Sequence, residues 1–106
     1  MEGECEMESK EHEEIAKRIA RRQGVQYRPE SRGPDIKTPQ RVVEVGVDPR
    51  RVAEEIRQVI RSRKARYVAG PLDFAKAALE ATRGRGVGVM GPQGKILKRG
   101  TRGGKK

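Results

Sequence analysis

Apolar residues recur at helical spacing in three stretches of this chain, residues 10–23, 49–63 and 71–83. The middle stretch shows the pattern best, because its apolar residues fall at i, i+1, i+4, i+7 and i+8 on one helical face. They are Val52, Ala53, Ile56, Val59 and Ile60. Gly24 and Gly84 follow the other two stretches, where glycine typically ends a helix. The pattern therefore predicts three amphipathic helices.

Short β-prone runs lie between the predicted helices and are bounded by glycine and proline. The expected strands are residues 25–28, 35–38, 41–47, 65–69, 87–90 and 95–98. The resulting order is α-β-β-β-α-β-α-β-β. Such alternation predicts an α/β protein with a mixed central sheet flanked by helices.

The second and third strands are predicted to form a hairpin that turns at Pro39-Gln40. This register pairs Ile36 with Val43 and places Asp35 opposite Glu44. Opposed residues of an antiparallel pair have Cβ atoms about 5 Å apart, and two carboxylates that close repel unless a proton or a cation lies between them. The hairpin therefore suggests half of a divalent-metal site. Solvated carboxylates, with Asp35 in an Asx-type turn, are the alternative.

The chain has 106 residues, enough for a single modest core. We expect one domain over residues 10–98, a flexible acidic lead over residues 1–9 and a disordered basic tail over residues 99–106. Residues 1–14 hold seven acidic residues and one lysine, a net charge of −6, whereas the other 92 residues have a net charge of +16. The body of the protein is thus strongly basic.

A basic body favours phosphate backbones or anionic surfaces. No apolar run approaches the length of a membrane-spanning helix, so nucleic acid is the expected partner and a membrane is not. Only three aromatic residues are present, too few to stack many unpaired bases, which favours duplex or branched DNA. The lone Cys5 forms no internal disulfide and the start of the chain does not resemble a signal peptide. We therefore expect a cytoplasmic protein with no small-molecule cofactor.

The order of elements carries a short motif. A helix bearing acidic residues precedes Pro34-Asp35 on one strand and Glu44-Val45-Gly46 on the next, and a helix and a strand follow. Over residues 11–98 this arrangement resembles the PD-(D/E)-x-K nuclease superfamily, with its restriction endonuclease-like core. The small archaeal Holliday junction resolvase-like nucleases are the most similar members in size and layout.

The resemblance implies that Asp35 and Glu44 hold Mg²⁺ or Mn²⁺, with the Val45 carbonyl as a further ligand and Glu13 completing the site. Where the family has its lysine this chain has Gly46. Lys37 lies two residues from Asp35 on the same strand face, so we expect it to take over the catalytic role of that lysine. The single histidine, His12, is expected to be solvated or half-buried rather than a ligand.

The implied function is a metal-dependent DNA endonuclease or resolvase-type nuclease. Two alternatives stay open: a non-catalytic DNA-binding protein with a degenerate nuclease fold, and a small ribosomal-type RNA-binding protein. Basic residues expected to contact phosphates are Arg28, Arg32, Arg50, Arg51, Lys95, Lys98, Arg99, Arg102, Lys105 and Lys106. Ordinary solvated charge is the alternative for these residues. Leu72, Phe74 and Met90 are expected either in the core or at a homodimer interface.

Overall fold

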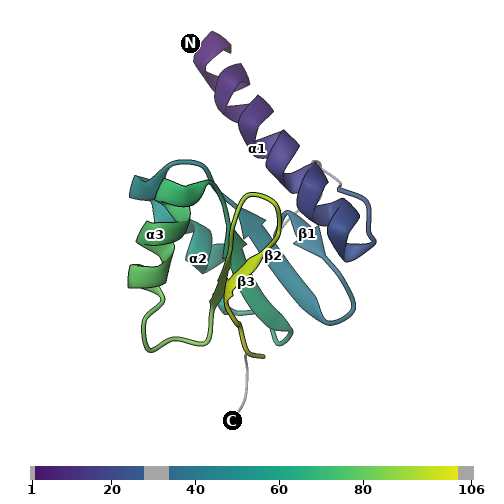
Figure 1. Cartoon of the computed structure of the whole chain (residues 1–106), viewed down its shortest axis with the longest axis vertical. Coiled ribbons are helices and arrows are strands. Elements are labelled where there is room, and N and C mark those ends of the chain that lie inside the picture. The colour runs from purple at the N-terminus through teal and green to yellow at the C-terminus, as the bar shows by residue number, and fades with distance from the viewer. Residues whose placement is uncertain (1, 28–33, 103–106) are drawn as a thin grey trace.

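A computed structural model describes residues 2–27 and 34–102, with the backbone only for residues 2–9. Its elements are α1 (Glu2–Gln23), β1 (Ile36–Lys37), β2 (Arg41–Val45), the 3-10 turn η1 (Pro49–Arg51), α2 (Val52–Ile60), β3 (Ala65–Ala69), α3 (Leu72–Ala81), β4 (Gly88–Met90) and β5 (Ile96–Lys98). Figure 1 shows α1 as a long helix that extends beyond the sheet. Helices α2 and α3 lie together on the side of the sheet away from α1. None of the described helices is long and apolar enough to cross a membrane.

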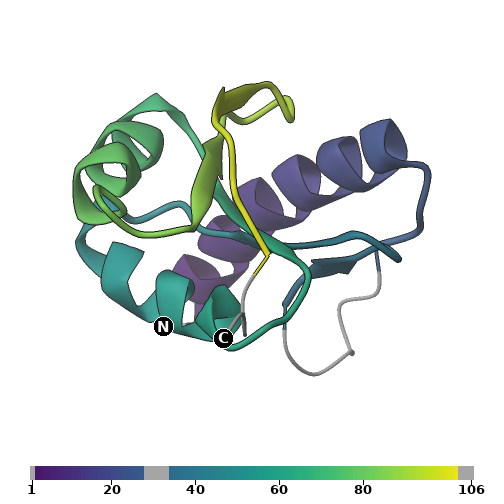
Figure 2. The ribbon, with the colours of Figure 1, turned by 90° about the horizontal axis from the view of Figure 1, so that it is seen from below.

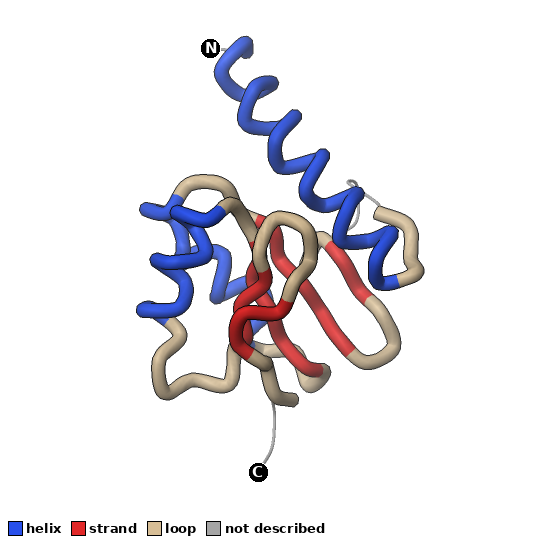
Figure 3. The backbone as a smooth tube through the Cα atoms, in the orientation of Figure 1, coloured by secondary structure: helices blue, strands red, loops and turns tan. Residues whose placement is uncertain are grey.

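The five strands form one mixed sheet in the order β1-β2-β3-β4-β5 (Figure 3). The central strands β2, β3 and β4 are parallel, whereas the edge strands β1 and β5 each run antiparallel to their neighbour. The parallel connections pass through α2 and α3, as parallel strands require a crossover. The carboxyl ends of three parallel strands therefore meet at one edge of the sheet. The predicted α/β class with a mixed sheet is confirmed.

Helices cover both faces of this sheet (Figure 2). On one face, Val43, Val45 and Tyr67 pack against Ile15 and Ile19 of α1. On the other face, β2–β4 contribute Val42, Val68 and Val89, and α2 and α3 contribute Val52, Ile56, Val59, Phe74, Ala75 and Ala78. Because successive strand residues point to opposite faces, the continuous apolar runs of the central strands supply both cores.

Phe74 and Met90 are fully buried, so they belong to the core rather than to a subunit interface. Leu72, the third residue considered for such an interface, is 66 % exposed. An exposed leucine does not by itself show a subunit interface, so the homodimer stays a prediction.

The register predicted for the hairpin is confirmed, since Ile36 pairs with Val43 and Lys37 with Val42. The strand predicted at residues 25–28 is wrong for its described part, residues 25–27, which form no strand. The amide of Val25 instead donates to the Ala20 carbonyl at 2.9 Å and caps α1. A residue whose amide closes a helix end does not donate to a sheet ladder. The observed order is therefore α-β-β-α-β-α-β-β.

Within the described residues, helical structure and sheet contacts reach further toward both chain ends than the predicted elements do. Helix α1 begins at Glu2, not at residue 10, because acidic residues in a first turn are favoured by the helix dipole and the segment lacks proline. At the other end, the carbonyl of Thr101 accepts from the Arg66 amide at 3.3 Å, and Ala65 pairs with Arg102. Thr101 and Arg102 therefore contact β3, whereas the disorder expected for the tail stays a prediction. Residues 103–106, which include Lys105 and Lys106, lie outside the described part.

Candidate functional site

Acidic and basic side chains gather at the carboxyl end of β2, where β1, β2, α1 and α2 meet. A cavity of about 320 Å³ opens there. It is lined by His12, Glu44, Val45, Gly46, Val47, Asp48, Arg51 and Glu55. Ligands of open α/β sheets commonly bind at the carboxyl ends of the strands, which makes this cavity the candidate functional site.

The structure brings Asp35 and Glu44 together, as the hairpin register requires. The Asp35 amide donates to Oε1 of Glu44 at 3.2 Å, and the Val45 amide donates to Oδ2 of Asp35 at 2.9 Å. These two bonds extend the hairpin beyond the last pair of β1 and β2. They fix Asp35 beside Glu44, which lines the cavity.

Glu55 of α2 is a third carboxylate at this site, and sequence reasoning missed it. Glu44 and Glu55 contact one another through their side-chain carboxyl groups. Glu55 lies one helical turn before Val59, at the margin of the apolar face of α2, whereas Glu54 points away from that face. The helical wheel therefore held a signal for Glu55.

Burial and crowded negative charge dominate the electrostatics of the cavity. Burial first, then the charge of Asp35 and the contact with Glu55, raise the pKa of Glu44 to about 9. Burial also raises the pKa of Glu55. The nearby Tyr27 has its pKa raised to about 12 by burial and by the charges of Asp35, Glu13 and Glu44. A cation in the cavity would relieve this repulsion.

His12 faces the same carboxylates from α1. Its Nε2 lies 3.0 Å from Oδ2 of Asp35, and its side chain is 28 % exposed. The hydrogen bond to Asp35 raises the pKa of His12, against the opposing effect of burial. The expectation of a half-buried histidine is correct, but its partner was not foreseen. On the helical wheel His12 lies on the same face as Ile15, Ala16 and Ile19, which was the available signal.

Other predicted site residues lie less centrally. Glu13 is 47 % exposed and pairs with Lys17 at 3.6 Å. Lys37 is exposed on the edge strand β1 and does not line the cavity. Val45 is buried, and its amide donates to Asp35. The backbone of Val45 also contacts the His12 side chain. The structure thus places His12 and Glu55 nearer to Asp35 and Glu44 than it places Glu13 or Lys37.

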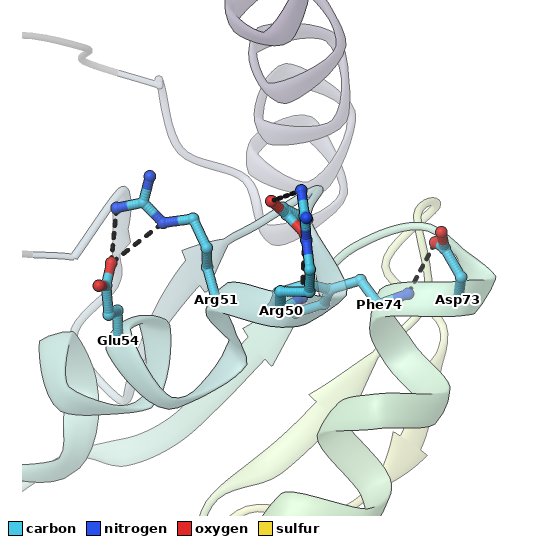
Figure 4. A network of polar contacts seen from close by, with 6 residues as sticks. Arg50, Arg51, Glu54, Asp73 and Phe74 are labelled. Carbon is cyan, nitrogen blue, oxygen red and sulfur yellow. Dashed lines mark hydrogen bonds and ion pairs between the residues drawn. The ribbon is translucent and has the colours of Figure 1, made fainter.

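Gly46 is enclosed by the ring of Phe74. A Cβ atom at this position would lie 2.5 Å from Cε2 of Phe74 and 3.0 Å from Cγ of Glu55. Phe74 is fully buried, and its amide is held at 2.7 Å by the Asp73 carboxylate at the start of α3 (Figure 4). The ring cannot move without repacking the core, so the position that the family gives to lysine has no room for a side chain.

Replacing Gly46 with Ala should destabilise the fold by about 1–3 kcal/mol, the usual cost of overpacking a core. Denaturant unfolding measures this loss. Gly91→Ala is the matched control, because a Cβ atom there would meet only the Lys95 carbonyl oxygen, at 4.0 Å. Equal stability of the Gly46 variant and the parent would contradict the close packing described here.

Several of the predicted phosphate-binding residues have defined partners. Arg51 lines the cavity, and its Nε donates to Glu54 at 3.0 Å, with Nη2 on the same carboxylate (Figure 4). Arg50 contacts Asp48, the N-cap of η1, through Nε at 3.2 Å. The Lys98 ammonium donates to the carbonyls of Thr82 and Arg85, which follow α3 in the chain. Exposed positions are held by Lys95, Arg99 and Arg102, whereas Arg28 and Arg32 lie outside the described residues.

Asp35 and Glu44 offer carboxylate oxygens, the donor type that Mg²⁺ and Mn²⁺ prefer. Among the described side chains, those of residues 10–27 and 34–102, no three His, Cys, Asp or Glu residues are arranged as a complete metal-binding group. Two carboxylates are nevertheless enough for Mg²⁺, which keeps several of its waters. The donor set therefore fits a divalent cation bound mainly by Asp35 and Glu44.

A scan against protein-family models, a search of curated proteins and a search of solved structures each gave no match to this chain.

Proposed function

We propose that this protein is a metal-dependent nuclease that hydrolyses phosphodiester bonds in duplex or branched DNA. The observation that carries this proposal is the convergence of three carboxylates in a strongly basic protein: Glu44 and Glu55 line one cavity, and Asp35 is hydrogen-bonded beside Glu44. The resemblance to PD-(D/E)-x-K nucleases adds support, because a hairpin with Asp35 and Glu44 leads through α2 to a further strand of the same mixed sheet.

Each side chain has a physical role in this proposal. Asp35 and Glu44 would hold Mg²⁺ or Mn²⁺, which when bound polarises a phosphate and lowers the pKa of a bound water. His12 orients the Asp35 carboxylate through its hydrogen bond. Glu55 contacts Glu44 while Glu44 is protonated, and this contact would be replaced when Glu44 ionises and binds the cation. Arg51, the arginine that lines the cavity, contacts the phosphate of the DNA.

A second candidate is a non-catalytic DNA-binding protein that retains a degenerate nuclease fold. The packing of Phe74 against Gly46 favours it, since the lysine typical of the family has no space at that position. Lys37, the other candidate for that role, does not line the cavity. Under this alternative the basic surface binds DNA and the carboxylates have no chemical role.

Incubation with linear, nicked, single-stranded and four-way-junction DNA distinguishes these functions. A nuclease should cleave at least one duplex or branched substrate with Mg²⁺ or Mn²⁺ and none with EDTA. Tight, salt-dependent DNA binding without cleavage would favour the second candidate. Stronger binding to structured RNA than to any DNA would contradict both candidates.

Replacing Arg51 with Gln should lower the cleavage rate by about a hundredfold, the usual loss when a charged group that stabilises a transition state is removed. DNA affinity should change only a few-fold. Single-turnover kinetics and binding isotherms separate the two effects. Arg57→Gln is the matched control, because Arg57 is an exposed arginine of α2 that does not line the cavity. Equal rates for the two variants would remove Arg51 from the proposed site.

A further inference from the structure

A second and larger cavity, of about 740 Å³, lies at the other end of β2. It opens between the end of α1, the β1–β2 turn and the loop that joins β4 to β5. Its polar lining comes from Arg22, Gln23, Thr38, Gln40 and Arg41. Since a strand rises about 3.3 Å per residue, Arg41 and Val45 lie about 13 Å apart along β2. The cavity is therefore separate from the carboxylate site.

The charge of this cavity is positive. None of the described residues that line it is acidic, and two of them are arginines. The guanidinium of Arg41 lies over the ring of Tyr67, 5.6 Å from its centroid, and donates through Nη1 to Oε1 of Gln23 at 3.0 Å. Arg22 donates through Nη1 to the Gln93 carbonyl at 3.2 Å. Both guanidinium groups are thus held in place at the cavity by a single hydrogen bond each.

Each guanidinium carries five N–H donors. Within residues 2–27 and 34–102, one donor of Arg41 and one of Arg22 have a protein acceptor. The remaining donors are available to a ligand in the cavity. The bonds already made orient each planar group without using up its capacity to bind an anion.

The backbone around the cavity is also fixed. The Thr38 hydroxyl accepts from the amides of Gln40 and Arg41 at 3.1 and 2.9 Å, which locks the turn. At the end of α1, the Gly24 amide donates to the Arg21 carbonyl at 3.1 Å, and the Val25 amide donates to the Ala20 carbonyl. This cap satisfies two of the carbonyls at the end of the helix, and Arg22 and Arg41 offset the negative end of the helix dipole. A Cβ atom at Gly24 would meet no atom within 4 Å, so the cavity is open on this side.

We propose that this cavity binds a phosphate group, either of a free nucleotide or of a polynucleotide strand. Two oriented guanidinium groups match the planar, bidentate recognition of phosphate oxygens. The side-chain amides of Gln23 and Gln40 add neutral donors at the same rim. The proposal does not depend on metal binding or cleavage at the carboxylate site.

A ¹H–¹⁵N NMR titration of the full chain in EDTA tests this site without loading the carboxylates. The probes are inorganic phosphate, AMP, and a short oligodeoxynucleotide with either a 5′-phosphate or a 5′-hydroxyl. We expect saturable shifts at the amides of Gly24, Gln40, Arg41 and Gly94. Arg22→Gln should weaken binding about tenfold, as expected for a lost hydrogen bond to a charged group. Arg57→Gln, which removes the same charge outside the cavity, should bind like the parent.

The two oligonucleotides identify the source of the phosphate. Preference for the 5′-phosphorylated strand assigns the site to a terminal phosphate, equal binding of both strands assigns it to an internal one, and tighter binding of AMP than of either strand assigns it to a free nucleotide. The proposal is overturned if no probe gives saturable shifts at these amides, or if Arg57→Gln weakens binding as much as Arg22→Gln. Because Arg41 packs on Tyr67, the test relies on Arg22→Gln, with Arg41→Lys added to retain the charge while removing the planar fork.

Discussion

Asp35→Asn and Glu44→Gln should each abolish metal-dependent DNA cleavage, with a loss of at least about a thousandfold in rate. Both substitutions preserve side-chain shape but remove the negative charge that holds a divalent cation. The bound metal supplies several kcal/mol of transition-state stabilisation, and each 1.36 kcal/mol corresponds to about a factor of ten. DNA affinity should be unchanged or slightly higher, because a charge that repels phosphates is gone. Cleavage time courses and equilibrium binding in Ca²⁺ or EDTA measure the two properties.

Glu80→Gln is the matched control for these variants, since Glu80 is an exposed residue of α3 that pairs with Arg83 far from the cavity. It should cleave like the parent. Glu13→Gln should have a milder effect than either site variant, because Glu13 is half exposed and paired with Lys17. Full activity of the Asp35 variant would eliminate the proposed metal site.

The same carboxylates should lower the stability of the metal-free protein. Glu44→Gln is expected to raise Tm in EDTA near neutral pH, since a neutral glutamine amide avoids the cost of keeping a buried carboxyl group protonated above its ordinary pKa. A gain of about 1 kcal/mol would raise Tm by about 4–8 °C in a domain of this size. Glu80→Gln, at an exposed position, should leave Tm within about 1–2 °C of the parent.

The stability gain should depend on pH with a definite sign. The unfolded chain releases the Glu44 proton near the ordinary pKa of 4.5, whereas the folded protein retains it until the raised pKa of about 9. Between these values the folded state binds more protons, so the free energy of unfolding falls as pH rises. The raised pKa of His12 acts in the same direction above its ordinary value of 6.5. The difference in Tm between Glu44→Gln and the parent should therefore widen from about pH 5 to pH 8. A Tm difference that stays constant over this range would contradict the raised pKa of Glu44.

Metal binding should offset the loss of folding stability that the buried carboxylates cause. A cation that binds only the folded state stabilises it by mass action, so Mg²⁺ or Mn²⁺ should raise Tm of the parent more than that of Asp35→Asn or Glu44→Gln. This measurement does not depend on catalysis. A metal-induced Tm increase without cleavage of any DNA would favour a binding protein that keeps the metal site.

The sequence by itself determined the hairpin and the pairing of its carboxylates. The period of two along β1 and β2, together with the turn at Pro39-Gln40, leaves one register that buries Ile36 and Val43. That register places Asp35 beside Glu44. Helical periodicity likewise determined α2 and α3, because each apolar face must be buried against the sheet.

Local pattern failed where a backbone group had a competing partner. The residues at 25–27 have strand-like composition, but the Val25 amide closes the end of α1. At the other end of the chain, Gly100 lets the backbone approach Arg66 so closely that a Cβ atom would overlap the Arg66 carbonyl. The Val25 amide contacts its own helix, where a local cap competes with strand pairing, whereas the approach of Gly100 to Arg66 depends on how separate elements pack.

The rest of the candidate site was decided by tertiary structure. His12 reaches Asp35 across 23 residues because α1 crosses the sheet beside β1 and β2. Glu55 reaches Glu44 because the connection from β2 to β3 lays α2 on the opposite face. Phe74, from the following helix, fills the space beside Gly46. Contacts between distant residues depend on helix placement and core packing, which periodicity along the chain does not specify.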